Sequence, residues 1–385
     1  MSLRVGIVGL PNVGKSTLFN ALLKKRVALS ANYPFATVEP NVGVVAVPDE
    51  RLTKLAELVA LEETGEKVDP STGSTTLTTN TLRTSRPPVV PAVVQFVDIA
   101  GLVKGASVGE GLGNQFLSHI REVDALIHVL RDFTDENIVR AGSENPESDK
   151  ATIETELILA DLQTLDKLIV AQEKEAKVSK DSLETQKLQI LKQIADDLNA
   201  GKSIARFTID DEQLTNWFKT LPLLSIKPVL YVYNVDEEEY GQTYHGRVIN
   251  VQENSLFICA KLEEELADLS EQERKDYLKE LGIEETGLER LIKKAYALLD
   301  LISFLTAGKK EVRAWTIKEG TKAAQAAGVI HSDFEKNFIR AEVVEYEKLI
   351  EAGSHVAAKQ KGWMKIEGKD YIMRDGDVVE FLVGS

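Results

Sequence analysis

The chain has 385 residues and a formal net charge of −15 at pH 7. This negative charge argues against broad electrostatic binding to nucleic acid, and no DNA partner is expected. No apolar run reaches the ~20 residues that a membrane span requires. The single cysteine excludes an internal disulfide. Together with an N-terminus that enters an apolar strand at once, it is typical of a cytoplasmic protein.

A phosphate-binding motif lies near the N-terminus. Residues 9–17 read G-L-P-N-V-G-K-S-T, which fits the P-loop pattern G-x-x-x-x-G-K-S/T between a strand and a helix. The two glycines let the backbone turn so that successive N–H groups point at phosphate oxygens. We expect Lys15 to contact the β- and γ-phosphates and the hydroxyl of Ser16 to bind Mg²⁺. The nucleotide-binding residues expected from this motif are Asn12, Val13, Gly14, Lys15, Ser16 and Thr17.

Two segments downstream complete a nucleotide switch. Residues 31–40 contain two prolines and no hydrophobic period, which predicts a loop. Switch proteins bind Mg²⁺ through a threonine in such a loop, and Thr37 is the candidate. Residues 92–97 predict a strand that ends in D-I-A-G. Asp98 would support the metal, and the N–H of Gly101 would sense the γ-phosphate.

The group that positions the attacking water is not evident from the motifs. Many related GTPases carry a glutamine after the D-x-x-G glycine, whereas this chain has Leu102, which cannot align a water. A helix predicted over residues 114–123 carries His119, which is either a catalytic or a structural histidine. Asn12 also has two readings: it shapes the loop, or its amide oxygen holds a monovalent cation such as K⁺ beside the phosphates.

The middle of the chain interrupts the strand pattern. Residues 125–130 predict a buried strand in which His128 is a core histidine with its hydrogen bonds satisfied. Apolar residues then repeat at helical spacing over 153–168 and 188–198, with a charged stretch at 174–181. The repeats predict two long antiparallel helices, a coiled-coil hairpin. The hairpin is either a solvated arm or a partner-binding arm.

The base-recognition motif departs from that of GTPases. Residues 228–233 predict a strand that ends in N-V-D-E, where GTPases carry N-K-x-D. Val235 replaces the lysine, and Glu237, one methylene longer, replaces the aspartate that reads guanine. Because sites that read a base by hydrogen bonds discriminate strongly, the loss of this aspartate favours ATP or weak selectivity. The alternative is that Glu237 still reaches guanine.

The remaining segments predict the end of this domain and a small β domain. We expect a last strand at 256–261, a closing helix over 285–304, and a C-terminal β-grasp module with a hairpin over 365–372. Further elements of this module are expected at 312–317, 321–327, 333–337, 338–344 and 378–383. Trp363, between lysines 361 and 365, either stacks on nucleic acid or packs in the core.

Four motifs together resemble the Obg-like ATPase family, the YchF group of P-loop proteins. They are the P-loop, N-Y-P-F-A-T-V-E-P-N-V-G, D-I-A-G-L-V-K-G-A-S-x-G-E-G-L-G-N-x-F-L, and N-V-D-E. The resemblance implies an ATP-preferring hydrolase, a helical arm inserted in the nucleotide-binding domain, a C-terminal TGS domain and association with the ribosome or ribosomal RNA. It also implies that His119 substitutes for the missing glutamine, and that Asn234 and the main chain of Val235 contact the base. Ala36 departs from the family pattern, in which a cysteine often precedes the threonine.

The sequence therefore predicts an α/β protein with a doubly wound, mostly parallel sheet, a helical insertion and a β-grasp domain. The expected domains are 1–133 and 223–304 for nucleotide binding, 134–222 for the arm and 305–385 for the β-grasp. We expect a monomeric ATPase with Lys15, Gly101 and His119 in catalysis, Ser16, Thr37 and Asp98 on Mg²⁺, and Asn234, Val235 and Glu237 at the base. The alternatives are a strict GTPase and a nucleotide-shaped scaffold with little catalysis.

Overall fold

The computed structural model describes residues 3–26, 41–64, 86–101, 112–135, 138–140, 144–179, 182–205, 207–244, 254–283 and 285–384. The chain forms two compact units. The described residues of 1–27, 37–44 and 95–291 form the first unit, and those of 45–94 and 292–385 belong to the second.

A six-stranded sheet forms the centre of the first unit. Its strands lie in the order β2-β4-β1-β5-β6-β7, and β4, β1, β5, β6 and β7 are parallel neighbours. The bounds are β1 Arg4–Gly9, β2 Val42–Ala46, β4 Val93–Asp98, β5 Ala125–Arg131, β6 Val229–Asn234 and β7 Ser255–Ile258. Because parallel strands end at the same edge, the P-loop, Asp98 and Asn234 are brought to one side of the sheet. The predicted fold class is confirmed for this part of the chain.

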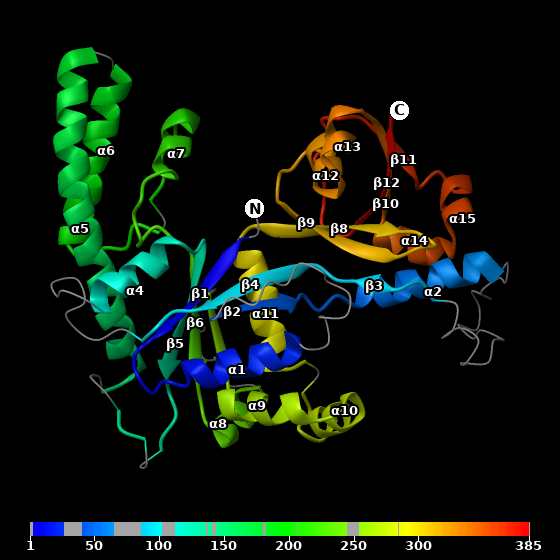
Figure 1. Ribbon diagram of the computed structural model, residues 1–385, viewed down its shortest axis with the longest axis horizontal. Helices are drawn as coiled ribbons and strands as arrows, with labels where there is room; N and C mark the ends of the chain where they lie inside the picture. The colour runs from blue at the N-terminus through cyan, green and yellow to red at the C-terminus, as the bar shows by residue number, and fades with distance from the viewer. Residues whose placement is uncertain are drawn as a thin grey trace. The chain divides into compact units, whose positions relative to one another are not determined.

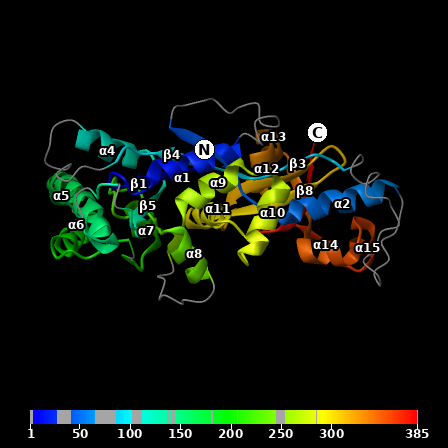
Figure 2. The ribbon, with the colours of Figure 1, turned by 90° about the horizontal axis from the view of Figure 1, so that it is seen from below.

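Helices cover this sheet. They are α1 Lys15–Arg26, α4 Leu112–Arg121, α8 Glu237–Tyr244, α9 Ala260–Asp268, α10 Glu271–Glu280 and α11 Gly287–Leu298. Helix α1 packs against α9, as Figure 2 shows. The closing helix predicted over 285–304 was too long. Asp300 adopts a left-handed conformation with φ of 53°, which ends the helical path, and the chain enters strand β8 at Leu301.

The predicted helical hairpin is confirmed. Helices α5 (Pro146–Ser179) and α6 (Ser182–Asn199) lie side by side in Figure 1, and α7 (Glu212–Phe218) follows. Leu165, Ile194 and Leu198 are buried in one cluster at the base of the hairpin. The charged stretch expected to connect the helices is largely the last turns of α5. Among the described residues, no helix is long and apolar enough to cross a membrane.

The second unit contains a mixed sheet in the order β11-β10-β12-β8-β9-β3. Its strands are β3 Val89–Val90, β8 Leu301–Ala307, β9 Val312–Lys318, β10 Phe338–Glu345, β11 Lys365–Glu367 and β12 Asp377–Val383. Strands β8 and β9 form an antiparallel hairpin, and β12 lies parallel to β8. Helix α12 (Ala323–Ile330) buries its alanines against this sheet. This is the predicted β-grasp arrangement.

Two features of the second unit differ from the expectations. The hairpin over 365–372 was wrong: β11 pairs with β10, and Ile372 makes only an isolated bridge with Lys322. Helix α2 (Glu50–Thr64) was not expected, and it packs beside α14 (Tyr346–Ala352), as Figure 2 shows. Helices α13 (Ser332–Lys336) and α15 (His355–Gln360) complete the unit.

Specific polar contacts explain why α2 joins the C-terminal part of the chain. Arg51 pairs with Asp375 at 2.7 Å, and Glu62 accepts a hydrogen bond from the backbone N–H of His355. The carboxylate of Glu62 also lies 3.0 Å from Nδ1 of His355. Together these hydrogen bonds hold the pKa of Glu62 below its usual value, against the opposing effect of burial. These contacts join residues about 300 positions apart in sequence. No local sequence pattern predicts them.

Candidate nucleotide-binding site

The turn between β1 and α1 has the geometry of an anion-binding loop. Asn12 and Gly14 both have positive φ, 64° and 92°. A side chain at Gly14 would collide with the amide group of Asn234, so only glycine fits there. Helix α1 starts directly after this turn, at Lys15. Its first N–H groups and its dipole therefore point toward the space in front of the loop.

A cleft of about 1180 Å³ opens at this end of the sheet. Its walls come from the P-loop, the D-x-x-G segment, the segment after β5, the N-V-D-E segment and the start of α9. The predicted site residues that line it are Asn12, Gly14, Lys15, Ser16, Thr17, Gly101, Asn234, Val235 and Glu237. The structure thus brings together most of the nucleotide-binding residues expected from three separate motifs, and the volume suits a nucleotide.

Lys15 and Asp98 form an ion pair at the phosphate end of the cleft. Lys15 is 9% exposed, and Asp98 ends strand β4, directly beside β1. Ser16 is exposed in the cleft at the first turn of α1. Gly101 lies close to the P-loop, because a side-chain carbon there would sit 3.5 Å from the carbonyl oxygen of Gly9. A cation, a hydroxyl and a carboxylate therefore meet where the phosphates of a nucleotide would lie.

The side chain of Asn234 forms hydrogen bonds to both the phosphate end and the base end of the cleft. Its Nδ2 donates to the carbonyl of Val13 at 2.9 Å, and its Oδ1 accepts from the N–H of Ala260 at 2.9 Å. The side chain is 5% exposed. Because an amide has two N–H donors and two lone pairs, one of each remains for a base. Val235 is buried and its N–H donates to Ile258, so only its carbonyl is left for the predicted main-chain contact.

The base end of the cleft is acidic. Asp236, Glu237, Glu238 and Glu264 line it, with Lys261 as the basic residue. Asp236 accepts from the N–H of Glu239 at 2.9 Å and so caps α8. The hydroxyl of Tyr277 donates to Oε1 of Glu237 at 3.1 Å, which gives the carboxylate in the guanine-reading position a partner within the protein.

Sequence reasoning missed one wall of the cleft. Phe133, Thr134, Asp135 and Ile138, which follow β5, line it as well, and we call these four residues the cleft wall. Next to it, Nδ2 of Asn12 donates to the carbonyl of Val139 at 3.2 Å. This contact agrees with the loop-shaping reading of Asn12 and leaves its amide oxygen available for a cation. The only sequence signal for the wall was its position after a buried strand of the sheet.

Buried Cys259 also lines the cleft, and burial raises the pKa of its thiol. On the opposite side of β6, burial raises the pKa of Asp132, an effect to which the nearby Glu239 adds. Both shifts follow from the same cause: the base end is partly closed to water and carries excess negative charge.

Four other residues of the sequence analysis have different outcomes. His119 is half-buried on α4 and is not among the residues that line the cleft. Thr37 and Leu102 lie outside the described residues. His128 is a core histidine, as predicted: it is 2% exposed, and burial lowers its pKa to about 3. The expectation that its hydrogen bonds are satisfied was wrong, because its buried Nε2 has no hydrogen-bond partner among the described residues.

Three features define a P-loop nucleotide-binding domain. They are a glycine turn between a strand and a helix, a buried lysine paired with the aspartate of D-x-x-G, and a parallel sheet with the site at its carboxyl edge. Comparison with known proteins agrees. Residues 4–154 match the family model described as "50S ribosome-binding GTPase", and residues 301–384 match a model named YchF-GTPase_C and described as a protein of unknown function.

Full-length relatives make the assignment more specific. The chain is 46% identical to the "Ribosome-binding ATPase YchF" of Bacillus subtilis strain 168 and 45% identical to that of Escherichia coli O157:H7, over 99% of each chain. The solved structure of the Schizosaccharomyces pombe YchF GTPase superposes with a TM-score of 0.81 at 34% identity, over 99% of this chain and 98% of that one. The chain belongs to the YchF family, as its motifs predicted.

Proposed function

We propose that this protein is a Mg²⁺-dependent ATPase that prefers ATP to GTP and acts as a conformational switch on the ribosome. The observation that supports nucleotide hydrolysis most directly is Lys15, which lines the cleft together with the rest of the P-loop and Gly101 and forms an ion pair with Asp98. Relatives at 45–46% identity are named ribosome-binding ATPases. We propose that the protein works in the cytoplasm, beside the ribosome.

The residues at the phosphate end fit Mg²⁺. The exposed hydroxyl of Ser16 and the carboxylate of Asp98 are oxygen ligands of the kind that this ion prefers. Thr37 is proposed as a further ligand on sequence grounds. When bound, the ion neutralises charge on the β- and γ-phosphates. Lys15 and the P-loop N–H groups orient the same oxygens, and Gly101 offers its N–H to the γ-phosphate.

Two observations support adenine over guanine. The Asp that reads guanine N1–H and N2 amine in GTPases is replaced by Glu237, and the hydroxyl of Tyr277 occupies one oxygen of that carboxylate. Asn234 keeps one N–H and one lone pair, and the carbonyl of Val235 can accept from an exocyclic amine, which adenine carries at position 6. The site therefore offers the carbonyl of Val235 as an acceptor for the exocyclic amine of adenine, and it lacks the aspartate that selects guanine in GTPases.

His119 is proposed to position the attacking water. Helix α4, which carries His119, begins at Leu112 and is the first described element after the D-x-x-G segment, so it is the helix that a movement of this part of the chain would reach first. We expect His119→Ala to lower the turnover rate at saturating ATP at least tenfold, with the Kd for ATP little changed. An unchanged basal rate would remove this assignment and leave the nucleotide-binding proposal intact.

Strict GTP hydrolysis is the second candidate, because Glu237 does line the cleft and the Schizosaccharomyces pombe relative is named a GTPase. Steady-state hydrolysis of ATP and GTP, measured side by side with and without purified ribosomes, separates the two. The proposal expects slow intrinsic turnover, faster ATP than GTP hydrolysis, and stimulation by ribosomes. The β-grasp unit, proposed to be a TGS domain, and the helical arm would supply the ribosome contacts.

The scaffold alternative has its own test. A Lys15→Ala protein that binds no nucleotide but still associates with ribosomes, and restores function to cells that lack the wild-type protein, would favour a scaffold over a switch. The proposal expects loss of the cellular function.

A further inference from the structure

Arg131 is a buried cation that the motifs do not account for. It is the last residue of β5 and is 4% exposed. Its guanidinium donates to three main-chain carbonyls: Nη1 to Ile138 at 3.1 Å, Nη2 to Asp135 at 3.2 Å and Nε to Phe133 at 3.4 Å. All three acceptors belong to the cleft wall. The guanidinium carbon also lies 4.5 Å from the centre of the Phe133 ring.

The geometry suits a positioning role. A planar guanidinium with five N–H donors can hold several carbonyls of one irregular segment at fixed directions, which a lysine ammonium cannot. The described residues of this segment, 132–135 and 138–140, form no helix or strand. Its place in the cleft therefore depends on Arg131, and on the contact between Asn12 and the carbonyl of Val139.

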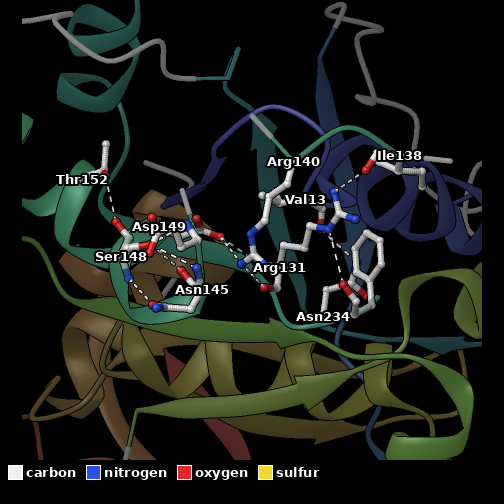
Figure 3. A network of polar contacts seen from close by, with 11 residues as sticks. Val13, Arg131, Ile138, Arg140, Asn145, Ser148, Asp149, Thr152 and Asn234 are labelled. Carbon is white, nitrogen blue, oxygen red and sulfur yellow. Dashed lines mark hydrogen bonds and ion pairs between the residues drawn. The ribbon is translucent and has the colours of Figure 1, made fainter. Parts of the chain in front are cut away.

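The other side of Arg131 reaches the helical arm, as Figure 3 shows. The carboxylate of Asp149, in the first turns of α5, accepts from the N–H of Arg131 at 3.4 Å and from Nη2 of Arg140 at 3.5 Å. Arg140 Nη2 also donates to the carbonyl of Arg131 at 2.8 Å. Asp149 is 1% exposed, and burial raises the pKa of its carboxyl, which the two arginines oppose.

The start of α5 fixes the position of Asp149. Asn145 caps the helix, with its Oδ1 accepting from the N–H of Ser148 at 2.9 Å, and Pro146 occupies the first helical position. Further along, Glu154 of α5 binds the hydroxyl of Tyr231 on β6 at 2.6 Å. The root of the arm is thus held against the two strands that end at the cleft.

We infer that Arg131 is a positioning residue for the nucleotide, and that Asp149 links the cleft wall which Arg131 holds to the helical arm. Contacts run from α5 through Asp149 and Arg131 to Ile138 of the cleft wall, and the next residue, Val139, accepts a hydrogen bond from Asn12 of the P-loop. A nucleotide that orders the wall therefore favours one placement of the arm root, and a partner that fixes the arm root changes nucleotide affinity by the same factor. This inference rests on the proposed nucleotide-binding function.

The test compares Arg131→Lys with Arg4→Lys by calorimetric titration of a non-hydrolysable ATP analogue and by steady-state ATP hydrolysis. Arg4 lies at the opposite, amino-terminal end of β1, where its Nε donates to Gln95 at 3.2 Å. We expect Arg131→Lys to raise the Kd and the KM for ATP tenfold or more, with kcat within twofold of wild type. Arg4→Lys should leave all three values unchanged.

The link to the arm is tested by a second matched pair on α5. Asp149→Asn should raise the Kd for the analogue threefold or more, and its effect should not add to that of Arg131→Lys. Asp161→Asn is the control. Asp161 is equally buried on the same helix, but it accepts from Leu224 and Ser225, away from the cleft. It should leave the Kd unchanged even where it lowers the melting temperature.

The outcomes separate this inference from the proposed function. A wild-type protein that binds neither ATP nor GTP overturns the proposed function and this inference with it. A wild-type protein that binds, with Arg131→Lys binding equally well, overturns this inference alone. Losses of affinity that follow the losses of thermal stability across all four variants would mean that Arg131 has only a general structural role, which also overturns it.

Discussion

The two ends of the cleft are built on different physical principles. The phosphate end consists of main-chain N–H groups, a lysine and an aspartate, all held by one continuous turn and one strand end. The base end consists of side chains from the segments after β6 and β7, which carry four acidic residues, and of the cleft wall that follows β5. The phosphate end therefore depends on charge, and the base end depends on how well separate segments are held in place.

This difference explains why the phosphate end was predicted in detail and the base end was not. Residues 9–17 determine a local structure, since glycine at position 14 and the helix that follows are both local requirements. The cleft wall depends on Arg131, whose three acceptors are irregular backbone carbonyls that no motif encodes. Likewise, the bond from Tyr277 to Glu237 spans 40 residues, and the sequence showed only that Glu237 departs from the GTPase pattern.

The same reasoning applies to the fold. The parallel sheet, the helical hairpin and the β-grasp module follow from hydrophobic periods and were predicted. The assignment of α2 to the second unit depends on the pairs Arg51–Asp375 and Glu62–His355, which join distant parts of the chain. The wrong hairpin over 365–372 arose because its Gly-Lys turn is locally plausible, while β10 offers a longer partner for β11.

The largest expected effect tests the charge dependence of the phosphate end. Lys15→Ala should weaken ATP binding at least 100-fold, about 2.7 kcal/mol, because it removes the cation that faces the phosphates and leaves Asp98 without its partner. Calorimetric titration measures the loss. Lys24→Ala is the matched control on the same helix, since Lys24 pairs with exposed Asp268 and donates to the carbonyl of Glu264 at 3.5 Å, with no contact to Asp98. Equal losses in both variants would contradict the role of Lys15.

The next effect tests the link between the ends. Asn234→Ala leaves the carbonyl of Val13 and the N–H of Ala260 without their partner, and we expect a loss of roughly 2–4 kcal/mol in the free energy of unfolding. ATP affinity should fall as well. Asn199→Ala removes a comparable side-chain bond, to the carbonyl of Ala195 on the exposed end of α6, and should change the denaturant midpoint little. An Asn234→Ala protein with wild-type stability would show that the two hydrogen bonds of Asn234 do not stabilise the fold.

A third prediction concerns the sheet beneath the base end. His128, on β5, has a pKa of about 3 because of burial, whereas an unfolded chain has about 6.5. Between these values the unfolded state binds a proton that the folded state does not. Stability should therefore fall by about 2 kcal/mol between pH 7 and pH 5 through this residue alone. Denaturant unfolding at both pH values checks it: His128→Leu should have the flatter pH dependence, and an identical slope would refute the account.

The smallest expected effect concerns the selector itself. Glu237→Asp shortens the carboxylate, removes it from Tyr277 and restores the residue type of GTPases. We expect the ratio of the GTP and ATP dissociation constants to shift about tenfold toward GTP, or about 1.4 kcal/mol. Glu238→Asp, at a neighbouring residue that also lines the cleft, is the control. A ratio that moves equally in both variants would reflect the general acidity of the base end rather than Glu237.

The most direct test of the central claim is a calorimetric titration of the nucleotide-free wild-type protein with ATP and with GTP, each in the presence of Mg²⁺. The account predicts that ATP binds at least tenfold more tightly, because the guanine selector is absent and Glu237 has Tyr277 as its partner. Tighter binding of GTP would mean that Glu237 does read guanine, and would contradict the proposed ATP preference.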